Sequence, residues 1–250
     1  MTQFTAAEIT QDAFLGGRLT LSQPKQGYRA GVDAVLLSAC INAISGERVL
    51  ELGCGAGAAI LCLGQRIEGL SLTGVERDPA YAALARRNGV GRLKVVEADI
   101  TALPLDLRQR QFDHVLANPP YFDRGASISS QDLLREAAHA ENTPLAEWVG
   151  TAAKRLAPKG LMHFIHLTER LPEILAALPS GMGSIEVLPL AARQGRRPDR
   201  MILRARKNGR AAFRLHAARI LHSGSTHQSD ADDYTPEIAA ALRAGSPLYF

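Results

Sequence analysis

Short apolar runs alternate with helical patterns from residue 48 onward. The runs that predict strands lie at 48–52, 71–75, 93–96, 112–117 and 161–166. Apolar residues at helical spacing predict helices at 58–66, 79–88, 145–156 and 172–178. Strands that alternate with helices are typical of a parallel sheet with helices on both faces. The chain is therefore predicted to be an α/β protein.

The pattern changes on either side of this alternating region. Residues 1–47 precede the first predicted strand and contain the block 27–33, followed by a helical run. Segments 184–190 and 200–205 indicate two strands joined by a basic connection, and we expect an antiparallel pair that closes the sheet. Residues 122–143 have weak periodicity, and a connection of that length is usually functional or disordered. We interpret this connection as a substrate-facing lid.

Composition limits the location and the redox state. Charged residues interrupt every apolar stretch that is long enough to span a membrane. The first four residues lack the basic and apolar regions of a secretory signal. Cys40, Cys54 and Cys62 form no Cys-x-x-Cys pair, which indicates reduced and buried thiols. We expect a cytoplasmic protein without a membrane partner, and its oligomeric state stays open.

Positive charge is concentrated in one segment. Residues 191–220 carry ten Arg or Lys against one acid, Asp199, so the segment is +9 and the rest of the chain is −5 within a net charge of +4. Such a stripe favours a polyanionic partner such as RNA. The alternative is a solvated sheet edge whose cations discourage aggregation. The candidate substrate-binding residues in this stripe are Arg193, Arg196 and Arg197.

A glycine-rich turn follows the first strand of the sheet. Gly53, Gly55 and Gly57 allow the backbone to turn sharply and to approach a ligand closely. The spacing also satisfies a loose dinucleotide-binding fingerprint, so the turn alone does not decide the ligand. Glu51 precedes the glycines, where a carboxylate suits a cationic amino group better than a pyrophosphate.

Two further acids end the next two strands. Glu76 lies where the hydroxyls of an adenosine ribose are expected, and Asp99 lies where a carboxylate or an amide brackets an adenine. Asp99 is also a common turn former. Asp78, by contrast, precedes a proline, and we expect it to cap the following helix.

The strand at 112–117 runs directly into Asn118-Pro119-Pro120-Tyr121. In an open α/β sheet, ligands bind beyond the carboxyl ends of the strands, so this motif is expected beside the glycine turn. The side-chain oxygen of Asn118 and the carbonyl of Pro119 are able to accept both hydrogens of a planar amine and to direct its lone pair at a methyl donor. Tyr121, with Phe122, offers an aromatic face for a flipped base. The alternative is that Asn-Pro-Pro merely ends the strand.

With these residues the chain resembles the class I, Rossmann-like S-adenosylmethionine-dependent methyltransferases that carry Asn-Pro-Pro-Tyr. The likeness covers almost the entire chain, and it is strongest to the bacterial tRNA1(Val) adenine-37 N6-methyltransferase group. The residues that carry it are the blocks 27–37, 51–57 and 118–122, with 234–237 and 248–250 at the C-terminal end.

The resemblance implies one domain over residues 1–250, with a seven-stranded, mostly parallel sheet. Residues 48–250 form the Rossmann-like core, and residues 1–47 form a cap over the methionine end of the cofactor. S-adenosylmethionine is the implied methyl donor, and an adenine N6 in tRNA is the implied substrate. The implied cofactor-binding residues are Arg29, Asp33, Glu51, Gly53, Gly55, Gly57, Glu76, Asp99 and Asn118.

One position departs from the group. We expect a pair of substrate-binding arginines after the lid, and the chain has Arg135 but His139 at the second position. The exact RNA substrate therefore stays open.

Three rival functions fit parts of the pattern. Methylation of glutamine N5 in a protein, such as a release factor, also uses Asn-Pro-Pro-Tyr, but 47 residues are few for the helical substrate domain usual there. A dinucleotide-dependent dehydrogenase leaves that motif unexplained, and a non-catalytic RNA-binding protein leaves the intact motif and glycines unexplained. No metal site is expected, because His163 and His166 point to opposite faces of a strand.

Overall fold

The computed structural model describes residues 4–121, 143–224 and 233–250. Phe122, Arg135 and all but the last residue of the predicted lid lie outside these described residues.

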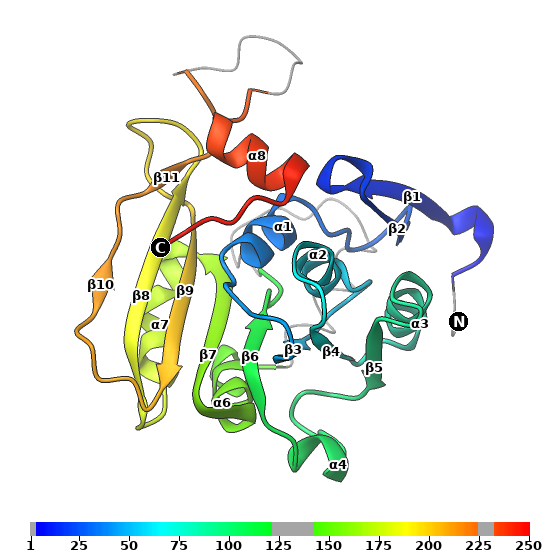
Figure 1. Cartoon of the computed structure of the whole chain (residues 1–250), viewed down its shortest axis with the longest axis horizontal. Helices are drawn as coiled ribbons and strands as arrows, with labels where there is room; N and C mark the ends of the chain where they lie inside the picture. Colours follow the sequence, from blue (N-terminus) through cyan, green and yellow to red (C-terminus); the bar gives the residue numbers. More distant parts are fainter. Residues whose placement is uncertain (1–3, 122–142, 225–232) are drawn as a thin grey trace.

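A nine-stranded sheet crosses the described chain in the order β10-β8-β9-β7-β6-β3-β4-β5, with β11 also paired to β8 (Figure 1). Strands β5, β4, β3, β6 and β7 are parallel to one another, whereas β9 is antiparallel to β7 and to β8. The α/β prediction and the closing antiparallel pair are confirmed. Seven strands form the expected sheet, and β10 and β11 add two residues each beside β8. The strands are β3 (Arg48–Leu52), β4 (Ser71–Glu76), β5 (Leu93–Glu97), β6 (Phe112–Ala117), β7 (Leu156–Leu167), β8 (Met182–Ala191), β9 (Arg200–Lys207), β10 (Arg214–Leu215) and β11 (Arg219–Ile220).

Strand boundaries follow the apolar pattern within two residues except at the start of β7. The predicted bounds of β3 and β6 agree with the structure. Strand β7 begins at Leu156 rather than at 161, because Leu156 already pairs with Phe112 before the register shifts. The intervening Ala-Pro-Lys-Gly sequence has the composition of a turn, and Lys159 has a φ of 67°, so the early pairing has no clear sequence signal.

Helices cover both faces of the sheet. One apolar core joins α1, α2 and α8 to Val49 and Leu116, and a second joins α4, α6 and α7 to Leu50 and Val115. Successive strand residues point to opposite faces, which is why neighbours such as Val49 and Leu50 belong to different cores. No helix among the described residues is both long enough and apolar enough to cross a membrane. The helices are α1 (Val32–Ala39), α2 (Ala58–Arg66), α3 (Pro79–Asn88), α4 (Leu105–Arg108), α6 (Leu145–Arg155), α7 (Leu171–Ala177) and α8 (Pro236–Ala244).

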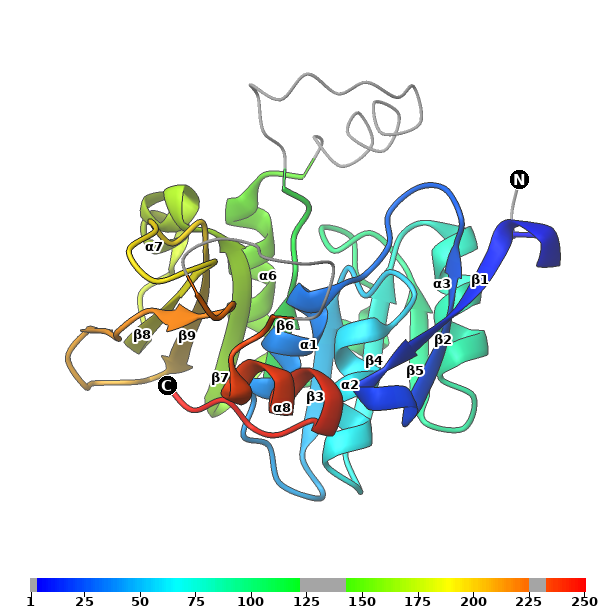
Figure 2. The same cartoon turned by 90° about the horizontal axis from the view of Figure 1, so that it is seen from above.

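A hairpin of β1 (Ile9–Phe14) and β2 (Leu19–Pro24) precedes the sheet and packs beside α3 (Figure 2). The sequence does not predict it, because polar residues interrupt both strands. Asn88, the last residue of α3, ties the hairpin down. Its Oδ1 accepts from Ser22 N at 2.8 Å, and its Nδ2 donates to Ser22 O at 3.0 Å and to Ala56 O at 2.9 Å. The hairpin is thereby fixed to the glycine turn.

Candidate active site

The parallel strands bring the predicted site residues to one edge of the sheet. Leu52, the last residue of β3, pairs with Ala117 at the end of β6 and with Val75 near the end of β4. The glycine turn therefore starts beside Asn118, and Glu76 ends the neighbouring strand. This is the edge at which open α/β sheets bind their ligands.

The glycine turn needs its glycines for two physical reasons. Gly53, Gly55 and Gly57 have φ values of 63°, 53° and 86°, which side chains disfavour. A Cβ on Gly53 would lie 2.5 Å from Cη2 of Trp148, a buried residue of α6. The turn thus brings the backbone into a position that any side chain would obstruct.

We expect Gly53→Ala to destabilise the protein by more than Gly46→Ala does. Gly46 also has a positive φ, of 91°, but a Cβ there meets nothing within 4 Å. Gly46→Ala is therefore expected to lose only the free energy of backbone strain, about 1–2 kcal/mol. Gly53→Ala adds the collision with Trp148. Urea unfolding of both variants measures their free energies of unfolding. Equal losses would show that Trp148 shifts to make room for the Cβ at little cost.

Two buried carboxylates bracket the turn. Glu51 Oε2 accepts from Ile60 N at 3.0 Å in the first turn of α2, and burial raises the Glu51 pKa to about 8. Glu76 accepts from Gly55 N at 2.8 Å and from Asp78 N at 2.9 Å, and burial raises its pKa as well. Repulsion from Glu76 adds to the rise at Glu51, and burial, followed by repulsion from both carboxylates, raises the pKa of the Cys54 thiol. A cation bound between them would relieve this cost.

The two aspartates near the strand ends have local partners. Asp78 Oδ1 accepts from Ala80 N at 2.7 Å and Tyr81 N at 3.2 Å, so its predicted role as a helix cap is confirmed. Asp99 Oδ1 accepts from Thr101 N and Oγ1 at 2.8 and 2.6 Å, the geometry of a turn former. The hydrogen bond from the Thr101 hydroxyl holds the Asp99 pKa below its usual range.

Asn118 has an asymmetric environment. Its Nδ2 donates to the hydroxyl of Tyr28 at 3.2 Å. Its Oδ1 is buried and has no hydrogen-bond partner among the described residues. Buried carbonyl oxygens are normally paired, so this acceptor is a strong indication of a functional position. Pro119 is buried, whereas Pro120 is exposed.

Comparisons with known proteins agree with this geometry. A family model described as "Methyltransferase domain" matches residues 49–140. A tRNA1(Val) (adenine(37)-N6)-methyltransferase from Mannheimia succiniciproducens is 30% identical over 172 residues, which are 66% of this chain and 69% of the relative. The protein of the same name from Actinobacillus succinogenes is 28% identical over 239 residues, which are 93% of this chain and 96% of the relative.

The chain belongs to the tRNA1(Val) (adenine(37)-N6)-methyltransferase family. It is an S-adenosylmethionine-dependent methyltransferase, so the prediction of this enzyme class and cofactor is confirmed. A solved structure of a predicted O-methyltransferase from Agrobacterium tumefaciens has a TM-score of 0.70 and 26% identity, and covers 87% of this chain and 99% of that one. A T. thermophilus 16S rRNA methyltransferase in complex with AdoMet and guanosine, 21% identical with a TM-score of 0.56, covers 80% of this chain and 50% of that one, and shares the fold. The Rossmann-like fold is thus confirmed.

Tyr121 and Asp33 join the Asn-Pro-Pro-Tyr segment to the N-terminal segment and to the sheet. The Tyr121 hydroxyl donates to Asp33 Oδ2 at 3.2 Å, and its ring meets the edge of the His166 ring at 5.1 Å between centroids. Arg200, the first residue of β9, forms an ion pair with the same Asp33 oxygen at 2.9 Å. Burial raises the Asp33 pKa, and the positive charge of Arg200 opposes that rise. Asp33 therefore holds Tyr121 in a fixed position.

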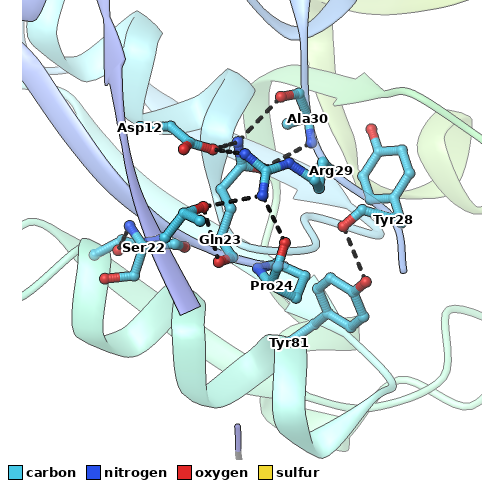
Figure 3. A network of polar contacts seen from close by, with 10 residues as sticks. Asp12, Ser22, Gln23, Pro24, Tyr28, Arg29, Ala30 and Tyr81 are labelled. Atoms are coloured by element: carbon cyan, nitrogen blue, oxygen red, sulfur yellow. Dashed lines mark hydrogen bonds and ion pairs between the residues drawn. The ribbon is translucent and has the colours of Figure 1, made fainter. Parts of the chain in front are cut away.

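Arg29 of the methyltransferase contacts the hairpin (Figure 3). Its guanidinium pairs with Asp12 at 2.6 Å and donates to Thr10 Oγ1 and Pro24 O, each at 2.9 Å. Gln23 forms two hydrogen bonds with the backbone of Ala30: its Oε1 accepts from Ala30 N at 2.7 Å, and its Nε2 donates to Ala30 O at 3.2 Å. These bonds attach the segment that carries Tyr28 and Asp33 to β1 and β2.

The three candidate arginines of the basic stripe have different environments. Arg193 donates to Asp233 and to the carbonyl of Ser223, and its side chain is 12% exposed. Arg196 is exposed, and Arg197 is 89% exposed with a 4.0 Å ion pair to Asp199. Only Arg196 and Arg197 of these three therefore face solvent.

Sequence reasoning assigned no role to Tyr28 or to Arg200. Tyr28 belongs to the block 27–37 that carries the family resemblance, and Arg200 is one of the cations of the basic stripe. Their contacts with Asn118 and Asp33 join distant parts of the chain, and no local spacing signals such contacts.

Proposed function

We propose that this methyltransferase transfers a methyl group to the N6 amine of an adenine in the anticodon loop of a tRNA. The observation that carries the proposal is the buried Oδ1 of Asn118, which lies beside the glycine turn and has no hydrogen-bond partner within the part of the chain that the structure describes. The names of the relatives, which are tRNA1(Val) (adenine(37)-N6)-methyltransferases, supply the substrate class.

The chemistry follows from the properties of an adenine amine. Its lone pair is delocalised into the ring, so the nitrogen is a poor nucleophile. Hydrogen bonds from the amine to Asn118 Oδ1 and to the carbonyl of Pro119 return electron density to nitrogen and orient the lone pair. Tyr121, held by Asp33 and His166, supports stacking of the base. No general base is required, because the proton leaves after transfer.

The site residues fit S-adenosylmethionine, which supplies a methyl group on a positively charged sulfur. Gly53, Gly55 and Gly57 allow the positive φ values of the turn at the edge of the sheet where the ligand is expected. Glu51 is the candidate partner of the cofactor's amino group, and Glu76 is the candidate partner of the ribose hydroxyls. Asp99 is the candidate at the adenine end.

Other assigned residues complete the proposed cofactor site. Asp33 and Arg29 support it from the N-terminal segment, which acts as a cap over the core of a single domain. The contact of Asn88 with both Ser22 and Ala56 supports that cap.

The raised Glu51 pKa predicts a pH-dependent stability. The unfolded group has a pKa near 4.5 and the folded group a pKa of about 8, so the folded state retains a proton that the unfolded state has lost. Stability is therefore expected to fall as pH rises from 4.5 through about 8, and Glu51→Gln is expected to flatten this slope while it weakens S-adenosylmethionine binding about tenfold. Thermal unfolding from pH 5 to 9 and calorimetric titration measure the two effects.

Glu68→Gln is the matched control, because Glu68 is exposed and remote from the glycine turn in sequence. A Glu51→Gln variant with the wild-type pH slope would contradict the assignment of a buried, protonated carboxyl. Unchanged cofactor affinity would remove Glu51 from the cofactor site.

Arg196 and Arg197 are the candidate phosphate contacts. The strand β8 pairs through Leu190 with Arg200, and Arg200 pairs with Leu167 at the end of β7. The connection 191–199 therefore lies at the same edge of the sheet as Asn118. Phe122 and Arg135 remain substrate-binding candidates outside the described residues, and Arg193 supports the connection from inside. A tRNA substrate supports a cytoplasmic location.

The test is transfer of labelled methyl from S-adenosylmethionine to total tRNA that lacks the modification, followed by nucleoside analysis. Label in N6-methyladenosine is the expected result. Label absent from RNA but present as N5-methylglutamine in added release factor would overturn the proposal, because a carboxamide presents similar N–H groups to Asn118.

A further inference from the structure

The Asn118 carboxamide has a chemical ambiguity that the motif does not resolve. Its two ends are an oxygen that accepts hydrogen bonds and a nitrogen that donates them. If the ends were exchanged, the nitrogen would meet the substrate amine donor to donor, and activation would fail. With Oδ1 on the substrate amine, the hydrogens of Nδ2 face the protein and need an acceptor there.

Tyr28 supplies that acceptor. Its hydroxyl oxygen accepts from Asn118 Nδ2 at 3.2 Å, while Asn118 Oδ1 has no partner among the described residues. Its ring lies against the glycine turn, with Cε1 3.7 Å from the place of a Cβ on Gly55. Burial, followed by the nearby carboxylates Glu51 and Asp33, raises the Tyr28 pKa, so the group stays a neutral phenol.

Helix α3 and the N-terminal hairpin hold the Tyr28 segment in place. The Tyr81 hydroxyl donates to the Tyr28 carbonyl at 2.9 Å (Figure 3). On the other side, Arg29 and Ala30 are bonded to Asp12 and Gln23 of the hairpin. The backbone at Tyr28 and directly after it is thus anchored, which limits the movement of the phenol beside the Asn118 amide.

We propose that Tyr28 is a positioning residue that accepts from Asn118 Nδ2 and so supports the carboxamide in the orientation with Oδ1 toward the substrate amine. The inference rests on the proposed role of Asn118 as the acceptor for that amine. It gives the N-terminal segment a part in the chemical step in addition to covering the cofactor.

Tyr28→Phe tests the hydroxyl, because it retains the ring over Gly55 and removes only the acceptor. We expect kcat to fall about tenfold, the effect of one lost hydrogen bond, with the KM for RNA and the Kd for S-adenosylmethionine within about twofold of wild type. Tyr249→Phe is the matched control, since Tyr249 is exposed and near the C-terminal end of the chain. It is expected to keep wild-type kcat.

Tyr28→Leu separates the ring from the hydroxyl. We expect it to show the same loss of kcat and, in addition, weaker S-adenosylmethionine binding. If Tyr28→Phe matches wild type and only Tyr28→Leu is impaired, Tyr28 only covers the cofactor and the inference is overturned. A rise in KM with unchanged kcat in Tyr28→Phe would overturn it too.

The inference and the proposed function fail separately. Wild-type label in N6-methyladenosine decides the function. The role of Tyr28 is decided by the ratio of the Tyr28→Phe kcat to the wild-type kcat. This ratio is measured on tRNA or, if only release factor is labelled, on release factor, because a glutamine amide needs the same acceptor as an adenine amine.

Discussion

Replacement of Asn118 by alanine is expected to lower kcat for methyl transfer about a hundredfold to a thousandfold, with the Kd for S-adenosylmethionine within about twofold of wild type. The side chain removed carries the buried Oδ1 that activates the amine in the proposed reaction. Loss of a preorganised polar group that acts mainly in the transition state affects kcat more than ground-state binding. Single-turnover methyl transfer and calorimetric titration of the cofactor measure the two quantities.

Asn42→Ala is the matched control for Asn118→Ala, because it makes the same chemical change at an exposed position before β3. It is expected to keep wild-type activity. If Asn118→Ala loses cofactor affinity in proportion to kcat, Asn118 belongs to the cofactor site and another residue activates the amine.

Reversal of charge at Arg196 and Arg197, as Arg196→Glu with Arg197→Glu, is expected to weaken tRNA binding by at least about tenfold. These two side chains face solvent at the edge that carries the candidate active site. Each lost phosphate contact lowers the slope of log affinity against log salt by about one, so the slope is expected to drop by about two. Cofactor affinity is expected to stay unchanged. Filter binding of tRNA at several salt concentrations measures both effects.

The matched control is the double variant Arg87→Glu with Arg92→Glu, which changes the net charge by the same amount. Arg87 lies in α3 and Arg92 directly precedes β5, the strand at the opposite end of the sheet order from β8. Both arginines are exposed, and Arg92 contacts only Gln65 in a described hydrogen bond. Equal weakening by the two double variants would assign the effect to overall charge. Unchanged tRNA affinity in Arg196→Glu with Arg197→Glu would move the docking surface elsewhere.

Local signals were sufficient for the centre of the fold. Strands β3 and β6 have the predicted bounds because each is a short apolar run ended by glycine or by Asn-Pro. Helix α3 begins where Asp78 and Pro79 predict. The hairpin of β1 and β2 had no such signal, because its polar residues are satisfied by partners that local sequence does not reveal, such as Asn88.

The candidate site was predictable in its residue types and less so in its contacts. The register of parallel strands brings Glu51, Glu76 and Asn118 to one edge, as the motif positions indicate. Arg193 and Arg200 pair with aspartates that are distant in the sequence, whereas Arg197 faces solvent. The neighbouring sequence does not distinguish these arginines. Tyr28 and Asn118 are 90 positions apart, so only the folded chain brings them together.

The packing of Trp148 on the glycine turn has a practical consequence. Trp148 is the only tryptophan in the chain, and its indole lies where a Cβ on Gly53 would collide with it. All indole fluorescence therefore arises beside the proposed cofactor site. A titration that follows this emission reads occupancy of the glycine turn directly, without a label, and applies unchanged to every variant that retains Trp148.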